Sequence, residues 1–352
     1  MLTRPKIPEI DIVRAIAIIA VVIIHGTANA TLLPVGTGSQ AFFFILNRAC
    51  LFTVPVFIWI SGVVLFYNYY DRWDPSTSFA FWTKRLRRIL IPYLLWSVFY
   101  YVYNQYMFHG KVTLNAWYLF KLVLSGNASY HLYYMLIIVQ FYILFPFVIT
   151  AVRKFPLLNK ALIPLGICLQ AAAYSVNHWV HPLPEYSSLF TSYSALFAFG
   201  AFTGIHYAAM STWIARYRSW ILSAMVLGGF AFVGMLLLHQ YGWIAVENTW
   251  FELALLLYCM TAALIFVQLG QNTLHKDSSF SKALTALGAA SFGIYLAHPA
   301  LLTLWDRLKP AKERILLYDL HTVTSFVIGL LGTWLLVRLY AHIMKKGKVS
   351  VK

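Results

Sequence analysis

Charged residues are scarce in this 352-residue sequence. Only 11% of the residues are Asp, Glu, Lys or Arg, whereas 61% are hydrophobic. A soluble domain carries about 25% charged residues, so the shortfall excludes an ordinary soluble protein and favours a chain whose solvent is mostly lipid. Once the apolar segments are set aside, too little remains for a separate soluble domain. We therefore expect one integral membrane domain over residues 1–352.

Cysteine is also rare, and several sequence motifs are missing. Cys50, Cys168 and Cys259 fall inside apolar stretches, and their number and spacing give neither a disulfide framework nor a metal-binding pattern. The histidines lack the spacing of zinc ligands. No Gly-x-Ser-x-Gly elbow, Walker loop or dinucleotide fingerprint is present. We expect no metal site and no tightly bound cofactor, and we find no case for a serine or nucleotide hydrolase.

Acidic residues are few as well, with 11 against 27 Lys and Arg, and the net charge is +16. In a soluble protein this excess would suggest nucleic acid as a partner. Here the basic residues cluster in short segments between apolar runs, where they set the orientation of a membrane protein. The pattern favours a lipid bilayer as the partner and argues against nucleic acid.

Long apolar runs are what the sequence does have. Each is close to the ~20 residues that cross a bilayer, and they predict an all-α polytopic membrane bundle of about ten transmembrane helices. The predicted spans are residues 10–32, 42–66, 87–108, 131–151, 158–178, 189–209, 215–238, 250–270, 284–305 and 320–343. The first run lacks a cleavable signal pattern and is expected to be a retained helix. With both termini in the cytoplasm, the inner segments hold three times as many Lys and Arg as the outer loops, which predicts an N-in, C-in orientation.

Three ionisable residues lie in the first predicted span, where such residues are costly and often functional. Arg14 and His25 are eleven residues apart, which is three turns plus ~20°, so they share one helix face and stand ~16 Å apart along the axis. Asp11 can pair with Arg14 three residues later. A cation near the inner mouth and a base at depth suit a long substrate with an anionic head and a reactive tail. The alternative is a snorkelling arginine and a structural histidine.

These residues resemble the signature of the acyltransferase-3 family of integral membrane acyltransferases, and four later segments resemble further family motifs in the same order. They are the apolar Val56–Gly62 that ends in Ser-Gly, the basic Lys84–Tyr93 with Arg-x-x-Arg at Arg85 and Arg88, His131–Met135, in which Trp is commoner than Tyr133, and Ser291–Pro299 with its Tyr-Leu-x-His. Each motif is weak alone, whereas five in order on ten helices are strong.

The resemblance implies transfer of an acyl group, usually acetyl or succinyl, from cytoplasmic acyl-coenzyme A. The acceptor would be a hydroxyl of an extracytoplasmic or lipid-linked glycan at the plasma membrane, as in proteins that modify exopolysaccharides. Some family members carry an extra soluble domain. We expect none here, and we expect this protein to act alone or with a separate partner such as a glycan synthase or exporter. The alternative is a transporter or flippase for a polysaccharide or lipid-linked saccharide, although no paired inverted repeats stand out.

Within this hypothesis His25 is the candidate general base, because imidazole titrates near neutrality. Arg14, with Asp11 beside it, would hold a phosphate or pyrophosphate of the donor or orient the base region, since guanidinium suits bidentate phosphate contacts. Both are candidate catalytic residues. Arg85 and Arg88, one helical turn apart, would hold further phosphates. The alternative for these two is simple anchoring at the inner boundary.

The remaining candidates would contact substrate. His298 lies at a depth similar to that of His25, which allows the two to meet, and Ser291 and Tyr295 share its helix face. The alternative for His298 is a histidine bonded to a neighbour near its helix end.

Arg48 is an unusual arginine at the start of the second span, which either binds an acidic group of the substrate or snorkels outward. His131 opens the fourth span. Ser61 is better explained by close helix packing at the Ser-Gly pair than by a role in chemistry.

Overall fold

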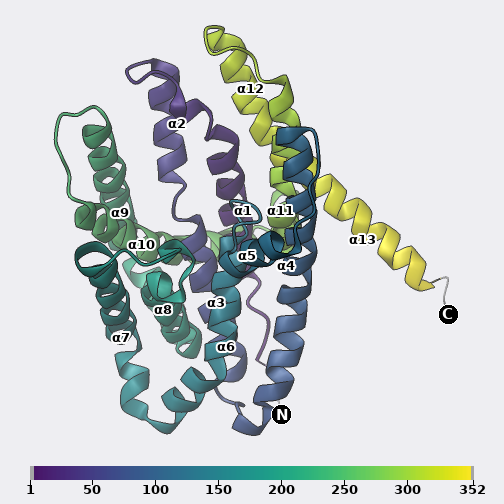
Figure 1. Ribbon diagram of the computed structural model, residues 1–352. Coiled ribbons are helices and arrows are strands. Elements are labelled where there is room, and N and C mark those ends of the chain that lie inside the picture. Colours follow the sequence, from purple (N-terminus) through teal and green to yellow (C-terminus); the bar gives the residue numbers. More distant parts are fainter. Residues whose placement is uncertain (1–3, 350–352) are drawn as a thin grey trace. The chain divides into compact units, whose positions relative to one another are not determined.

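A computed structural model describes residues 4–349 of the chain, with side chains described up to residue 344 (Figure 1). It confirms the all-α class, because no strand occurs in that range. The α-helices are α1 Glu9–Thr27, α2 Gly38–Ala49, α3 Thr53–Tyr69, α4 Ser78–His109, α5 Ala116–Ser125, α6 Tyr133–Lys154, α7 Pro156–Ser175, α8 Ser194–Ile205, α9 Tyr207–Gln240, α10 Asn248–His275, α11 Ser279–Trp305, α12 Ile315–Val327 and α13 Thr333–Val349.

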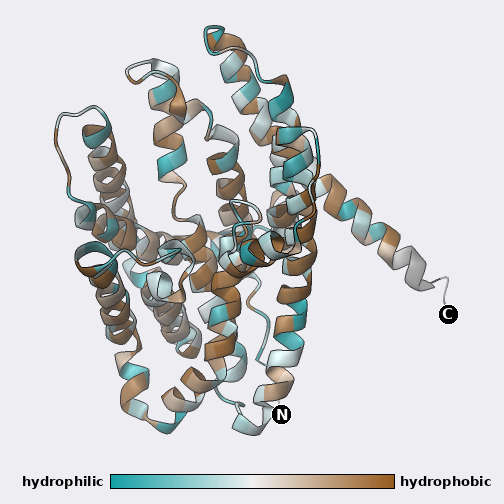
Figure 2. Cartoon of the chain, in the orientation of Figure 1, coloured by the Kyte–Doolittle hydropathy of each residue, from teal (hydrophilic) through white to brown (hydrophobic). Residues whose placement is uncertain are grey.

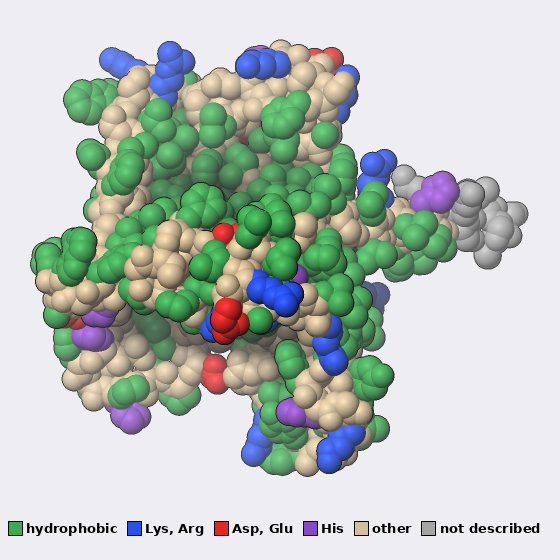
Figure 3. Space-filling model, turned by 90° about the horizontal axis from the view of Figure 1, so that it is seen from above, with side chains coloured by type: hydrophobic (Ala, Val, Ile, Leu, Met, Phe, Trp, Pro, Cys, Tyr) green, Lys and Arg blue, Asp and Glu red, His purple; other side chains and the backbone are tan. Residues whose placement is uncertain are grey.

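The helices have the length and hydropathy of a multi-pass membrane protein. Within the described residues, eight candidate spans are long and apolar enough to cross a bilayer. Hydrophobic residues dominate the long helices, and hydrophilic residues gather in loops and at helix ends (Figure 2). Figure 3 shows one face on which hydrophobic side chains cover broad areas and Lys and Arg form small separate groups. Large exposed apolar surfaces of this kind are rare on soluble monomers.

Each of the ten predicted spans overlaps a helix, and two of the ten are not among the eight candidates. The helix α4 is long, but Tyr and Trp residues with low hydropathy fill much of its second half. The segment Phe190–Ile205, which includes α8, is shorter than a span, and nearly all of α8 is buried. Helix α8 is thus enclosed by protein rather than by lipid.

The chain forms two compact units. Unit 1 comprises residues 4–6 and Phe57–Met210, and unit 2 comprises Ile7–Val56 and residues 211–349. Unit 1 holds most of α3 with α4 to α8, whereas unit 2 holds α1, α2, most of α9 and α10 to α13. The first and last predicted motifs therefore fall in the same unit.

Close helix contacts in unit 1 depend on small residues. Gly62 of α3 lies against the backbone of α8, and a Cβ at Gly200 would overlap the carbonyl group of Trp59. Gly200 and Gly204 form a Gly-x-x-x-Gly pair, the arrangement that lets membrane helices approach closely. The Ser61 hydroxyl donates to the Phe57 carbonyl 3.0 Å away on its own helix, which agrees with the packing interpretation of this Ser-Gly pair.

Helix α1 is the buried helix of unit 2. It packs against α11, α10, α12 and α2, and most of its residues are buried, from Ile10 to Val22 and again at Gly26 and Thr27. Gly288 of α11 brings α11 against the carbonyl of Asp11, and Gly270 of α10 does the same at Glu9. The helix that carries three predicted site residues is thus held by protein on several sides.

Candidate functional site

The N-terminal end of α1 carries an ion pair that the three-residue spacing predicts. The Arg14 guanidinium donates to Asp11 Oδ1 over 2.9 Å. Asp11 is only 3% exposed, whereas Arg14 is half-buried. A guanidinium has five N–H donors, so this pairing orients Arg14 and leaves donors for a second anion.

The two predicted histidines of unit 2 meet. The rings of His25 on α1 and His298 on α11 have centroids 5.3 Å apart and planes tilted by 31°. His298 has no exposed surface, while His25 is half-buried. His25 is therefore the member of the pair that a bound molecule reaches more easily.

The hydrogen bonds of His298 define its tautomer. Its Nδ1 lies 3.1 Å from the Ile294 carbonyl and 2.9 Å from the Tyr295 carbonyl. Because a carbonyl oxygen only accepts, Nδ1 carries a hydrogen and the neutral ring keeps its lone pair on Nε2. The bond to a neighbour on its own helix agrees with the structural alternative for His298, and the position beside His25 agrees with the functional one.

Ser291 and Tyr295 lie on the same buried face of α11 as His298. Both are 6% exposed, and the ring centroids of Tyr295 and His298 are 6.3 Å apart. The spacing of three, four and seven residues thus predicts their shared face correctly. Their proposed contact with substrate stays a prediction.

A polar clamp beside His25 was missed by the sequence reasoning. The Asn47 side-chain amide on α2 donates to the Ile24 carbonyl over 2.8 Å and to Thr27 Oγ1 over 3.0 Å. Thr27 Oγ1 in turn donates to the Ile23 carbonyl over 2.7 Å. Asn47 and Thr27 are buried, and an amide inside an apolar span was the available signal. The clamp attaches the turn that carries His25 to α2.

Arg48 follows Asn47 in the last turn of α2 and is half-buried. Its guanidinium carbon lies 4.9 Å from the centre of the Phe44 ring. The second predicted span, 42–66, is in fact two helices, because α2 ends at Ala49 and α3 begins at Thr53. Pro55 in the first turn of α3 was the available signal for this break, since the first turn is where a helix accommodates proline best.

The other predicted site residues belong to unit 1. On α4, Arg85 is half-buried with its guanidinium carbon 5.6 Å from the Tyr69 ring centre, and Arg88 is exposed. His131 precedes α6 and is buried, with Nδ1 3.2 Å from Ser129 Oγ and its ring edge-on to Tyr100. The phosphate role of the two arginines and the substrate role of His131 stay predictions.

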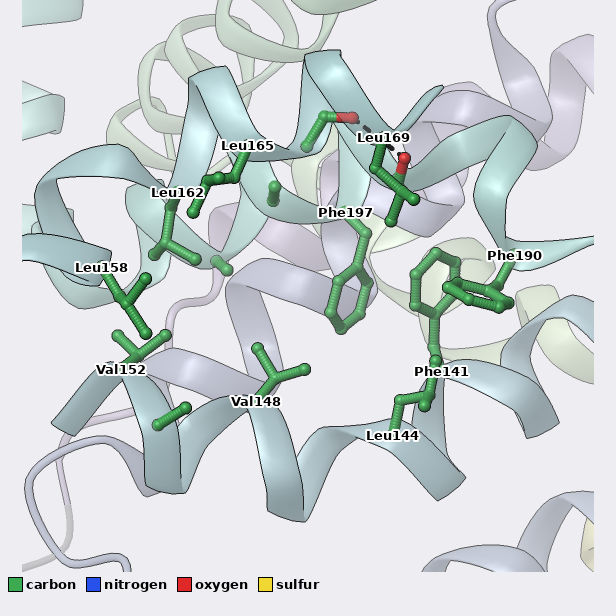
Figure 4. Close-up of a pocket in the computed structure, with 15 residues that line it drawn as sticks. Phe141, Leu144, Val148, Val152, Leu158, Leu162, Leu165, Leu169, Phe190 and Phe197 are labelled. Carbon is green, nitrogen blue, oxygen red and sulfur yellow. Dashed lines mark hydrogen bonds between the residues drawn. The ribbon is translucent and has the colours of Figure 1, made fainter. Parts of the chain in front are cut away.

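Unit 1 also contains an apolar cavity of about 280 Å³ between α6, α7 and α8 (Figure 4). Phe141, Val148, Leu162 and Phe197 project into it from three helices. Its one hydroxyl, Ser194 Oγ, already donates to the Gly166 carbonyl over 2.9 Å. The side chains that line this cavity therefore offer no group for acid–base chemistry.

No group of three or more His, Cys, Asp or Glu side chains suited to a metal ion occurs in the described part of the chain. The chemistry available in unit 2 is therefore that of an imidazole pair and an oriented guanidinium on one helix. Such a set can move a proton and hold an anion.

The comparison with protein families identifies the class of this chain. A family model described as an acyltransferase domain matches residues 7–338. The chain therefore belongs to the acyltransferase-3 family, as its motifs predict.

Individual relatives carry a different description. The chain is 25% identical over 309 residues to proteins of Staphylococcus aureus strains MSSA476 and NCTC 8325, each named "Probable poly-beta-1,6-N-acetyl-D-glucosamine export protein". The same name and identity apply to a protein of strain MRSA252 over 317 residues. Each match covers 84% of this chain and 82% of the relative. No solved structure matches the chain.

Proposed function

We propose that this protein transfers an acyl group from cytoplasmic acyl-coenzyme A to a hydroxyl of an extracytoplasmic or lipid-linked glycan at the plasma membrane. The meeting of His25 and His298 in the interior of unit 2 carries the proposal, because it supplies a base inside a membrane domain. Family membership supports acyl transfer, and the name of the Staphylococcus aureus relatives supports a polysaccharide as acceptor.

The reaction needs one proton to move twice. The glycan hydroxyl oxygen attacks the thioester carbonyl carbon while His25 takes the hydroxyl proton. The carbon–sulfur bond then breaks, and the leaving sulfur takes that proton from the imidazolium. The products are an ester and free coenzyme A. His298 lies beside the His25 ring, with 5.3 Å between the ring centroids, and would help to hold it in place.

The donor would enter with its phosphates towards Arg14. Arg14 and His25 share a face ~16 Å apart, which separates an anionic head from a thioester at the other end. Asp11 keeps the guanidinium in position. This orienting role explains why the Asp11 carboxylate lies beside Arg14, the cation that would bind the donor phosphates.

Replacing Asp11 tests that arrangement. In Asp11→Asn, we expect the KM for acyl-coenzyme A to rise about 3- to 10-fold and stability to fall by ~1–3 kcal/mol, because Arg14 loses a charged hydrogen-bond partner. Donor titrations and thermal unfolding in detergent measure the two effects. Asp277→Asn is the control, because Asp277 forms an exposed pair with Lys282 at 3.2 Å, and such pairs contribute little. An unchanged KM in Asp11→Asn would exclude an orienting role for Asp11.

The proposed function itself is tested with purified protein in lipid nanodiscs. Acyl-coenzyme A with an isotope label in the acyl group is supplied together with oligosaccharide acceptors. We expect release of free coenzyme A that depends on the acceptor, and a gain of one labelled acyl mass on the glycan. Hydrolysis without any glycan product, or no release at all, contradicts the proposal.

Saccharide export is the second candidate function, and the name of the Staphylococcus aureus relatives favours it. Sealed vesicles distinguish the two functions. Export predicts passage of the saccharide across the membrane without an acyl donor. Acyl transfer predicts no such flux and a modified saccharide only when the donor is present.

A further inference from the structure

The second candidate span is broken where it carries a charge. The apolar stretch Gly38–Tyr69 contains α2 and α3, with residues 50–52 between them. The carbonyl of Ala49, at the end of α2, accepts a hydrogen bond from the Tyr258 hydroxyl over 2.8 Å. Irregular backbone at membrane depth is tolerated where protein buries it or where it lines a polar cavity. Arg48 stands immediately before this break.

Arg48 lies within an apolar span. The candidate span Gly38–Tyr69 includes it, in the last turn of α2. Its side chain is half-buried, and a charge within a span is costly unless it faces the protein interior or binds an anion.

The surroundings of Arg48 do not neutralise it. The guanidinium lies over Phe44, which supplies a cation–π contact. Nε is buried and has no hydrogen-bond acceptor, and among the described side chains no carboxylate forms an ion pair with Arg48. Charged side chains within a span tend to pair with a partner, so this guanidinium has capacity for an anion from outside the chain.

The contacts of Asn47 show the level of Arg48 along α1. Asn47, the preceding residue, bonds to Ile24 and Thr27 on either side of His25 along α1. Arg48 is thus attached at the level of His25, while Arg14 lies ~16 Å away along α1. An anion at Arg48 would therefore lie at about the level of His25 along α1, apart from the phosphates assigned to Arg14.

We propose that Arg48 determines substrate specificity by binding a carboxylate next to the reacting atoms, and this proposal rests on the acyl-transfer function. A planar guanidinium binds a carboxylate through two parallel N–H···O bonds. Two substrates can bring this carboxylate: an acyl group that ends in a second carboxyl, or an acidic sugar of the acceptor. In either case the transfer steps are unchanged, and Arg48 only holds the substrate.

The test combines two donors with two acceptors. Coenzyme A thioesters of acetate and of a dicarboxylic acid such as succinate are each supplied with a neutral oligosaccharide or one that contains a uronic acid. In Arg48→Met we expect kcat/KM for the carboxylated substrate to fall about 10- to 100-fold, the effect of losing charge-assisted hydrogen bonds. With neutral substrates it should stay within about threefold of wild type. The affected pairings show whether donor or acceptor carries the carboxylate.

Two further variants make the result specific. Arg48→Lys keeps the charge without the planar fork, and we expect part of the selectivity to return. Arg338→Met is the matched control, because this variant also removes an arginine packed on an aromatic ring. Arg338 is exposed, and its guanidinium carbon lies 5.4 Å from the Trp334 ring centre. We expect Arg338→Met to change neither selectivity nor turnover. Size-exclusion profiles and melting temperatures establish that each variant is folded.

Three results would overturn the proposal. An equal loss with all substrates assigns Arg48 to the chemistry common to every transfer or to folding. An unchanged kcat/KM in Arg48→Met leaves a lipid phosphate as its partner. If the wild-type protein uses neither a carboxylated donor nor a carboxylated acceptor, then Arg48 does not bind a substrate carboxylate. Failure of the proposed function looks different, because wild-type protein then releases no coenzyme A from any pairing.

Discussion

Replacing His25 with alanine should reduce acyl transfer about 100- to 10,000-fold, the usual contribution of a general acid–base group. Its ring is half-buried and stands 5.3 Å from that of His298, centroid to centroid, so we propose it as the imidazole that receives the hydroxyl proton. The measurement is the rate of coenzyme A release at saturating donor and acceptor. We expect the fall in kcat, with little change in the KM for the donor, because Arg14 still holds the phosphates.

Controls separate chemistry from folding in this experiment. His275→Ala removes an exposed histidine in the last turn of α10 and should leave turnover unchanged. His298→Ala should also slow release, and the double variant His25→Ala with His298→Ala should be little slower than His25→Ala alone, because residues that act as a unit are not additive. A folded His25→Ala variant with wild-type turnover would remove the imidazole pair from the mechanism.

Much of the fold could be predicted from hydropathy, because a lipid-facing helix needs a long apolar run whatever its neighbours. Each predicted span overlaps a helix for this reason. The break at residues 50–52 and the burial of α8 were not predicted. Hydropathy does not distinguish an apolar residue that faces lipid from one that faces protein, and a continuous apolar run conceals a turn whose polar groups are satisfied by other helices.

The site could be predicted where its geometry is local. The Asp11–Arg14 pair and the shared face of Ser291, Tyr295 and His298 follow from helical spacing alone. The meeting of His25 and His298 was foreseen only as similar depth, since a sequence gives the height of a residue along a helix and not the neighbouring helix. The clamp made by Asn47 was missed for the same reason, because its bonds run between α2 and α1.

The second large effect is expected at Gly288, where α11 crosses α1. A Cβ at this position would overlap the backbone carbonyl of Asp11, and a rigid backbone atom cannot rotate away as a flexible side chain can. In Gly288→Ala the two helices must therefore separate. Overpacking of this kind costs ~1–3 kcal/mol and sometimes more. We expect a lower melting temperature in detergent and, per folded molecule, slower coenzyme A release, because the same crossing sets the approach of His298 to His25.

Gly234 on α9 supplies the matched control, because a Cβ there would meet no heavy atom within 4 Å. Gly234→Ala should be neutral or slightly stabilising, since alanine is favoured over glycine inside a helix by ~1 kcal/mol. The comparison isolates the helix crossing from the change in helix propensity that both variants share. If Gly288→Ala and Gly234→Ala have the same melting temperature and the same rate of coenzyme A release, then α1 and α11 can accommodate the added methyl group. The approach of the two histidines then does not depend on the close contact at Asp11.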